Sequence, residues 1–280
     1  MSGVLYIVAT PIGNLDDITL RAIEVLREVD VVAAEDTRHS QHLLAHLGLR
    51  KKMLSLHEHN ERERCAQIVR YLQSGQNIAL ISDAGTPLIS DPGYPLLQAV
   101  IEADLRVVPV PGVSSIITAL SAAGLPTDHF CFHGFLPQKN AERVARLKAL
   151  PLLLGTQILL ESTHRIERLL HQVDELMPDC RVVLAKELTK RHERFLRGSA
   201  HDILQLFAAD NALMKGEFVV LLHQPQLEVQ AAQLDNSRLL ELLMAEMPLK
   251  KAVKLAVEIS GGRKNELYQQ ALEIRQSTAD

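Results

Sequence analysis

The chain has 280 residues, of which 47% are hydrophobic and 23% charged, so it is long enough for two globular domains of ordinary size. Its three cysteines are far apart and none has zinc-ligand spacing, so we expect neither a disulfide framework nor a metal site. The formal net charge of −4, the absence of Trp and the 4% aromatic content argue against a protein that binds nucleic acid mainly by overall charge or base stacking.

Apolar strand candidates alternate with amphipathic helices over the first part of the chain. Strands are expected near residues 4–9, 31–35, 53–56, 78–82 and 107–110, with helices between them and over residues 114–123. Near-continuous apolar strands in repeated strand–helix units predict a parallel sheet covered by helices on both faces. Gly124-Leu125-Pro126 ends the last of these helices, and we place the first α/β domain at residues 1–122.

The second part of the chain has the same alternation. Strands are expected at residues 130–135, 157–161, 182–186, 195–198 and 218–223, and helices at 141–149, 164–176 and 201–209. This pattern predicts a second α/β domain at residues 123–225, with strands of mixed direction. Residues 224–236 have the composition of a linker, and two helices around Ser260-Gly261-Gly262 predict a small basic helical domain at residues 236–280.

The strongest functional signal is the loop at residues 82–93, which follows the apolar strand at 78–81. It holds two Gly, two Pro and two Asp, more than a turn requires. A rigid polar loop at the carboxyl end of a parallel strand is where open α/β sheets bind ligands. A second loop of this kind, at residues 109–115, favours a small-molecule site over an ordinary strand-to-helix connection.

Several familiar sites are absent from the sequence. It contains no GxxxxGK[ST], no GxGxxG after the first strand, no HExxH and no GxSxG, which argues against P-loop, dinucleotide, zinc-protease and serine-hydrolase chemistry. No basic stretch precedes an apolar core at the start, and no apolar run reaches the length of a membrane span. We therefore expect a cytoplasmic protein that does not enter a membrane.

Two segments are locally basic although the whole chain is acidic. Residues 186–197 hold five Lys or Arg against two Glu, a local charge of +3, and residues 248–268 have the same balance. Local patches decide polyanion binding more than the total charge does. For the second patch, the alternative to polyanion binding is a helical tail that packs in a dimer or only improves solubility.

Six segments, in order along the chain, resemble the tetrapyrrole methylase superfamily, and in particular a branch of it that methylates ribosomal RNA. They are Ala9-Thr-Pro-Ile-Gly-Asn-Leu15, Ala34-Glu-Asp-Thr-Arg38, residues 81–93, Pro109-Val-Pro-Gly112, Phe132-His-Gly-Phe-Leu-Pro137 and Lys186-Glu-Leu-Thr-Lys190. The resemblance extends from about residue 4 to the C-terminus. Thr163 stands where the family tends to have Pro, and we expect this difference to loosen a turn.

The resemblance implies S-adenosylmethionine as the methyl donor and the 2′-OH of a cytidine in the decoding region of 16S rRNA, within the small ribosomal subunit, as the acceptor. It also implies a cofactor cleft between two α/β domains, and a homodimer. Cofactor binding is expected at the two Gly/Pro loops and at Pro11. The residues expected to line the cofactor are Pro11, Asp83, Gly85, Ile89, Ser90, Pro111, Gly112 and Ser114. The loop also offers Thr86 and Asp91, and the alternative for Asp83 and Asp91 is that they only cap their own loop.

A weak nucleophile such as a ribose hydroxyl is helped by a positioned base or by a polarising cation. We expect Lys186, Glu187 and Lys190 of the second domain to face Glu35, Asp36 and Arg38 across the cleft, with Lys186 and Glu187 as the catalytic candidates. A Lys flanked by carboxylates is a plausible base or hydroxyl-orienting group, and an inter-domain ion pair or a set of phosphate contacts is an equally good interpretation.

RNA backbone contacts are expected at Lys190, Arg194, Lys250, Lys251, Lys254, Arg263 and Lys264. Lys139, Arg143, Arg146 and Lys148 could add phosphate contacts, although a charged helix face is more often only solvated. Two rival functions remain open: a methylase that acts on a porphyrin-like small molecule, and a ribosome-binding factor that has lost the chemistry.

Overall fold

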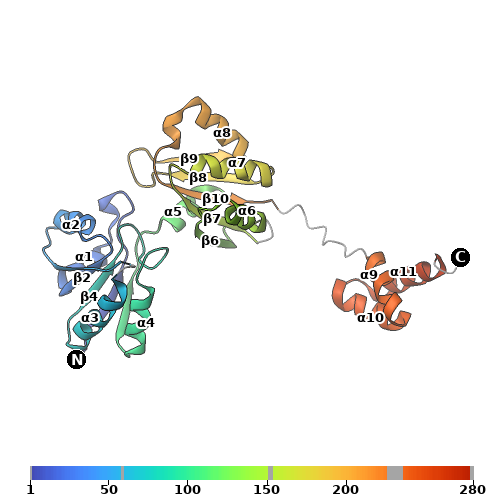
Figure 1. The fold of residues 1–280 in the computed structure, drawn as a ribbon, viewed down its shortest axis with the longest axis horizontal. Coiled ribbons are helices and arrows are strands. Elements are labelled where there is room, and N and C mark those ends of the chain that lie inside the picture. Colours follow the sequence, from blue (N-terminus) through green and yellow to red (C-terminus); the bar gives the residue numbers. More distant parts are fainter. Residues whose placement is uncertain (1, 58–59, 151–153, 226–235, 278–280) are drawn as a thin grey trace. The chain divides into compact units, whose positions relative to one another are not determined.

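The computed structural model describes residues 2–57, 60–150, 154–225 and 236–277. The chain divides into two compact units, residues 1–224 and residues 225–280, which are described separately (Figure 1). Among the described residues, no helix has both the length and the apolar character needed to cross a bilayer.

The first unit begins with a five-stranded parallel sheet in the order β3-β2-β4-β1-β5. This arrangement confirms the predicted parallel sheet. The central strand β4 and its neighbour β2 are buried along their whole length, as expected for strands covered on both faces. The strands are β1 (Val4–Val8), β2 (Val31–Ala34), β3 (Lys52–Ser55), β4 (Ile78–Ile81) and β5 (Arg106–Val110).

Two helices cover each face of this sheet. Leu26 and Leu44 of α1 and α2 are in the apolar core of one face, and Ile68 and Leu96 of α3 and α4 are in the core of the other. Full burial of each such side chain contributes about 1.5–3 kcal/mol. The helices are α1 (Leu20–Glu28), α2 (Thr37–His46), α3 (Glu61–Gln73) and α4 (Tyr94–Glu102), and the short 3-10 helix η1 (Leu15–Asp17) precedes α1.

The second sheet of this unit has the order β6-β7-β10-β8-β9. Its strands are mixed, as predicted: β6 runs parallel to β7, whereas β10 is antiparallel to both β7 and β8, and β9 is antiparallel to β8. The strands are β6 (Phe130–Phe135), β7 (Thr156–Glu161), β8 (Arg181–Lys186), β9 (Arg194–Gly198) and β10 (Phe218–His223).

Helices lie on both faces of the second sheet as well. Leu147, Leu170 and Phe207 of α6, α7 and α8 are in the core of one face, and α5 packs against the other through Ala119 and Leu120 (Figure 1). The helices are α5 (Ser115–Ala123), α6 (Asn140–Ala149), α7 (Ile166–Leu176) and α8 (Ala200–Ala209), followed by the 3-10 helix η3 (Asn211–Met214).

The C-terminal unit has three described helices where the sequence predicted two. They are α9 (Asn236–Glu246), α10 (Leu249–Ser260) and α11 (Lys264–Ser277), packed around Leu240, Val253 and Leu267. Pro248 divides the first predicted helix, because proline lacks the N–H that a continuous helix would need there. Gly261, with φ of 66°, ends α10 in the left-handed conformation that favours glycine.

Candidate functional site

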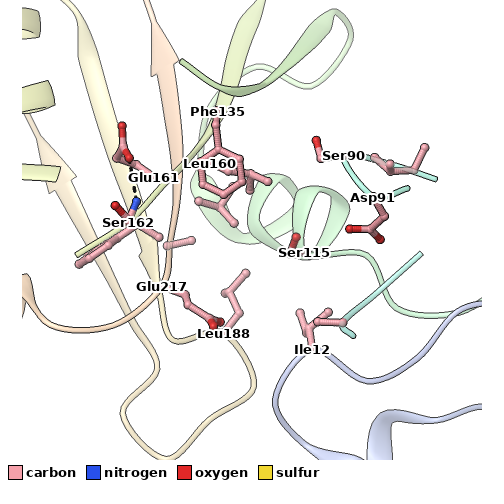
Figure 2. A pocket seen from close by; sticks show the side chains of 15 residues that line it. Ile12, Ser90, Asp91, Ser115, Phe135, Leu160, Glu161, Ser162, Leu188 and Glu217 are labelled. Carbon is pink, nitrogen blue, oxygen red and sulfur yellow. Dashed lines mark hydrogen bonds between the residues drawn. The ribbon is translucent and has the colours of Figure 1, made fainter. Parts of the chain in front are cut away.

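A cavity of about 330 Å³ lies where the loops of the first sheet meet the second sheet. In Figure 2, Ile12, Ser90 and Asp91 lie on one side of it, and Glu161, Ser162 and Glu217 lie on the other. Its remaining lining residues are Ala84, Ile89, Ser115, Phe135, Leu160, Ala185, Leu188, Phe218 and Val219.

The loop at residues 82–93 is fixed in place by its neighbours. Thr10 and Gly85 exchange two backbone hydrogen bonds of 2.8 and 3.0 Å, which tie the loop to the end of β1. The Thr86 hydroxyl donates to the carbonyl of Val113 at 3.0 Å. Ser90 has a φ of 70°, a conformation that costs a side-chain-bearing residue about 1–3 kcal/mol and persists where surrounding contacts enforce it.

Only some of the residues that were expected to bind the cofactor line the cavity. Ile89 and Ser90 line the cavity. Gly85 is held against Thr10, and the Asp83 carboxylate accepts the Asp36 backbone N–H at 3.3 Å. Pro11 is buried beside Ile12 in the chain, and Pro111, Gly112 and Ser114 line a separate depression of about 630 Å³ together with Asp17 and Thr189.

Asp36 and Arg38 lie at the start of α2. The Asp36 carboxylate accepts the backbone N–H groups of Arg38 at 2.8 Å and His39 at 3.4 Å, and so caps the helix. The Arg38 side chain pairs with Asp36 at 3.3 Å, and its hydrogen bond lowers the pKa of that carboxyl. Glu35 lines a small crevice that it shares with Asp91.

A lysine flanked by carboxylates is present, but it is Lys190. Its Nζ lies 3.2 Å from Glu187 Oε1 and 2.9 Å from Glu217 Oε2, and Glu217 lines the cavity. Lys186 is buried in β8, and its Nζ donates to the carbonyl of Ala212 at 2.9 Å. The catalytic role expected of Lys186 stays a prediction.

Within this cluster of Glu187, Lys190 and Glu217, Glu187 and Lys190 support each other's ionisation. Burial by itself would lower the pKa of Lys190, but its hydrogen bonds to Glu217 and Glu187 raise that pKa above its ordinary value. Burial likewise opposes ionisation of Glu187, whereas hydrogen bonds from the Glu217 backbone and from Lys190 lower its pKa. The cluster therefore holds a protonated lysine beside the cavity.

The turn at residues 187–190 is seated on the loop that follows β1. Glu187 and Thr189 have φ of 51° and 63°, which few residues with side chains adopt. The Thr189 hydroxyl accepts the Asn14 backbone N–H at 3.0 Å, and a Cβ on Gly13 would lie 2.6 Å from Lys190 Cγ. In the order of the first sheet, β4 separates the β1 loop from β2, which Glu35 and Asp36 follow. The turn therefore contacts the loop after β1, and the predicted facing of Lys186 and Glu187 with Glu35, Asp36 and Arg38 stays a prediction.

Three cavity carboxylates, Asp91, Glu161 and Glu217, were not among the predicted site residues. Burial raises the pKa of Asp91, and the neighbouring charge of Asp83 raises it further. Burial also raises the pKa of Glu161, whose side chain is only 1% exposed and pairs with Arg165 at 3.2 Å. The available signal was that Glu161 is an acidic residue at the end of an apolar strand, where parallel strands of α/β sheets place ligand groups.

Thr163 stands where the family tends to have Pro. We expected this difference to loosen the turn, but the Thr163 side chain stabilises it through two hydrogen bonds. Its hydroxyl donates to the Gly216 carbonyl at 2.6 Å and accepts the Gly216 N–H at 2.9 Å. These bonds hold Gly216 immediately before Glu217, so they contribute to the position of the lysine cluster.

The basic residues expected to contact RNA are mostly accessible. Arg194 is exposed at the start of β9, and Lys250, Lys251 and Lys254 are exposed on α10. Arg263 and Lys264 are exposed between α10 and α11, although Arg263 also pairs with Glu266 at 3.5 Å. Across the described part of the chain, no group of three or more His, Cys, Asp or Glu could hold a metal ion.

The fold and the cavity define a class of protein. The chain belongs to the Tetrapyrrole (Corrin/Porphyrin) Methylases, whose family model matches residues 4–204. A solved uroporphyrin-III-C-methyltransferase from Thermus thermophilus has the same fold, with a TM-score of 0.56 and 24% identity over 78% of this chain and 94% of that one. A cobalt precorrin-4 methyltransferase matches with a TM-score of 0.58 and 20% identity, over 78% of this chain and 94% of its own.

Within this class, the chain is most usefully compared with relatives of nearly equal length. It is 50% identical to ribosomal RNA small subunit methyltransferase I of Escherichia coli O157:H7, over 97% of this chain and 95% of the relative. It is also 50% identical to the protein of that name from Pseudomonas aeruginosa, over 97% and 98%. The model of the RsmI C-terminal HTH domain, a helix-turn-helix, matches residues 230–275.

Proposed function

We propose that the protein transfers a methyl group from S-adenosylmethionine to the 2′-OH of a cytidine in the decoding region of 16S rRNA. The observation that carries the proposal is the 50% identity to small-subunit rRNA methyltransferases over almost the whole chain, C-terminal helices included. The substrate would be met in the cytoplasm, on the small ribosomal subunit. The family resemblance supports a homodimer as the acting form.

The cavity fits the proposed donor. Its volume of about 330 Å³ is within the range of small-molecule sites, and its walls combine Ile12, Phe135 and Leu160 with the carboxylates of Asp91 and Glu161. When bound, the donor supplies a methyl group on a positively charged sulfur. Carboxylates on both sides would attract that cation and its ammonium group. A solved structure of this fold, a uroporphyrin-III C-methyl transferase from Thermus thermophilus, is described as complexed with S-adenyl homocysteine.

The lysine cluster supplies the groups that the acceptor hydroxyl needs. We assign to Glu217 the acceptance of the hydroxyl proton, because its carboxylate lines the cavity and its side chain is 81% exposed. Lys190 holds that carboxylate at 2.9 Å and, being protonated, can orient the ribose oxygen. Correct orientation of two reactants can supply roughly 7–11 kcal/mol of the barrier reduction.

A small-molecule methylase is the second candidate, favoured by the fold neighbours, which are described as enzymes acting on uroporphyrin and precorrin. Those chains match about 78% of this one. Against this candidate stand the C-terminal helices with their exposed lysines, which a small anionic substrate would not require.

The direct test is transfer of labelled methyl groups to small ribosomal subunits that lack the modification, followed by nucleoside analysis. We expect label in 2′-O-methylcytidine at one position. Binding of S-adenosylmethionine without transfer to subunits or to naked 16S rRNA would reject the RNA substrate, and transfer to a porphyrin-like compound would establish the second candidate.

A further inference from the structure

Three arginines lie close to the cavity residue Glu161, on α6 and at the start of α7. They are Arg143, Arg165 and Arg168. Arg143 is only 2% exposed, so it does not lie on the solvated helix face that was the alternative to a phosphate contact in the sequence analysis. Its Nε donates to Gln172 Oε1 at 2.6 Å. The side-chain oxygen of Asn140 accepts three bonds at once, from Arg143 at 3.2 Å, Arg168 at 2.8 Å and Gln172 at 2.9 Å.

The positive charge of this group exceeds its negative charge. Arg165 pairs with Glu161 at 3.2 Å, and among the described residues no carboxylate lies within ion-pair distance of Arg143 or Arg168. An amide oxygen with two lone pairs thus serves two guanidinium groups that have no carboxylate of the described residues within ion-pair distance, although the charge of Glu161 acts on Arg143 from farther away. Buried cations are normally paired with an anion, because removing them from water is costly.

The position of the arginines relates them to the proposed active site. Glu161 and Ser162 line the cavity, and Arg165 also donates to the carbonyl of Leu136 at 2.6 Å, next to the cavity residue Phe135. Arg168 is exposed, so the group can be approached from solvent. The N-terminus of α6, which has no side-chain cap, begins at Asn140 and adds unpaired backbone N–H groups.

We propose that Arg143, Arg165 and Arg168 form a binding site for one phosphodiester group of the RNA, next to the nucleotide in the cavity. This inference rests on the proposed function. Guanidinium groups match phosphate oxygens with paired donors, and a phosphate would supply the acceptors that the single Asn140 oxygen now provides. The site fixes the RNA backbone and thereby the ribose at the lysine cluster. Its residues are positioning residues.

A purely structural role is the competing explanation, in which the arginines only fasten α6 to α7 through Asn140 and Gln172. Such a role predicts lower stability on substitution but no special response to phosphate. The two explanations therefore differ in an equilibrium measurement that requires no RNA.

The first test measures the melting temperature of the full chain with inorganic phosphate against chloride at equal ionic strength. We expect phosphate to raise the melting temperature of the wild type, because a ligand that binds only the folded state stabilises it. The gain should be smaller in Arg168→Gln, which alters an exposed side chain, and absent in Arg143→Met. Arg181→Gln, which alters an exposed arginine at the start of β8, is the matched control and should keep the full gain. An equal gain in all four proteins, or none in the wild type, overturns the site.

The second test measures binding to 16S rRNA over a range of salt concentrations. Loss of one phosphate contact should reduce the slope of log affinity against log salt by about 0.7–0.9 in Arg168→Gln, with S-adenosylmethionine binding unchanged. An unchanged slope in Arg168→Gln and in a folded Arg143→Lys variant overturns the phosphodiester assignment. If the wild type responds to phosphate but neither binds nor methylates rRNA, the proposed function fails and the phosphodiester assignment fails with it, leaving only an inorganic anion site.

Discussion

Lys190 is held beside the cavity by two carboxylates that come from different strand ends. Glu187 follows β8 and Glu217 precedes β10, and these strands are antiparallel neighbours, which brings both side chains to one ammonium group. The arrangement keeps a cation and a base within one hydrogen bond of each other. The proposed chemistry depends on both.

Substitution of either group should therefore slow the chemical step. We expect Lys190→Met and Glu217→Gln each to reduce kcat by roughly 10²–10⁴-fold, the usual range for a positioned acid–base group. The measurement is single-turnover methylation of small subunits at saturating donor. Glu175→Gln, an exposed carboxylate on α7, serves as the control. A lower melting temperature with unchanged kcat would show that the cluster is only structural.

Asp91 gives a prediction about pH. Its pKa is raised by burial, so the free protein keeps this group partly protonated at pH values above the ordinary 3.8, whereas a bound cation favours the carboxylate. Affinity for S-adenosylmethionine should therefore increase as pH rises through that raised pKa and then level off, with protons released on binding. Calorimetry in buffers of different ionisation enthalpy measures this release. Asp91→Asn should lose part of the pH dependence, and an unaltered profile would place the cation elsewhere.

At the scale of elements, short turns at the strand ends decide which side chains reach the cavity. The turn at residues 187–190 contains two residues with positive φ and rests on Gly13, while Gly216 faces Glu187 from the start of β10. The turn at residues 187–190 and the segment at Gly216 are both short. A shift of the backbone in either one would therefore also move the side chain of Lys190 or Glu217.

Gly216→Ala tests this dependence. Gly216 has a φ of 118°, and an added Cβ would lie 2.6 Å from Glu187 Cγ. The variant should lose more than about 1 kcal/mol of stability and also lose kcat, because Glu187 must move. Gly48→Ala is the matched control, since Gly48 has a φ of 69° with open space around it. It should lower stability alone. Equal kcat in the two variants would contradict the coupling.

At the scale of the whole molecule, the cavity and the lysines of α10 belong to different compact units. A chain built in this way can lose RNA affinity without any change at the cavity. The helix-turn-helix match of residues 230–275 and the exposed cations of α10 favour RNA contacts by the second unit.

The double variant Lys250→Gln/Lys254→Gln should weaken binding to 16S rRNA and reduce its salt slope by up to about 2, with S-adenosylmethionine binding unchanged. Arg238→Gln on α9, whose charge is already paired with Glu241, is the control. Filter binding at several salt concentrations measures both quantities. If the double variant and the control bind equally well, this helix face has no role in RNA binding.

The sequence by itself determined the parallel and mixed sheets, the Gly/Pro loop at the cavity and the family. The sheets and the loop depend on the order of apolar residues along each strand and on turn residues, which are local properties. The family was identified by the resemblance of six short segments to its motifs. Pro248, which separates α9 from α10 and so gives three C-terminal helices in place of the predicted two, was also visible in the sequence.

Only the tertiary structure decided which charged side chains meet. Lys186 and Lys190 are equally plausible by spacing, but β8 points Lys186 toward Ala212, and a turn with two positive φ values brings Lys190 back to Glu187. Arg143 is a charged residue, yet it is buried. On α7, Gln172 accepts a hydrogen bond from Arg143, and Arg168 bonds to the same Asn140 oxygen as Arg143 does. Contacts between residues that are distant in the chain depend on how strands and helices cross, and no local pattern contains that information.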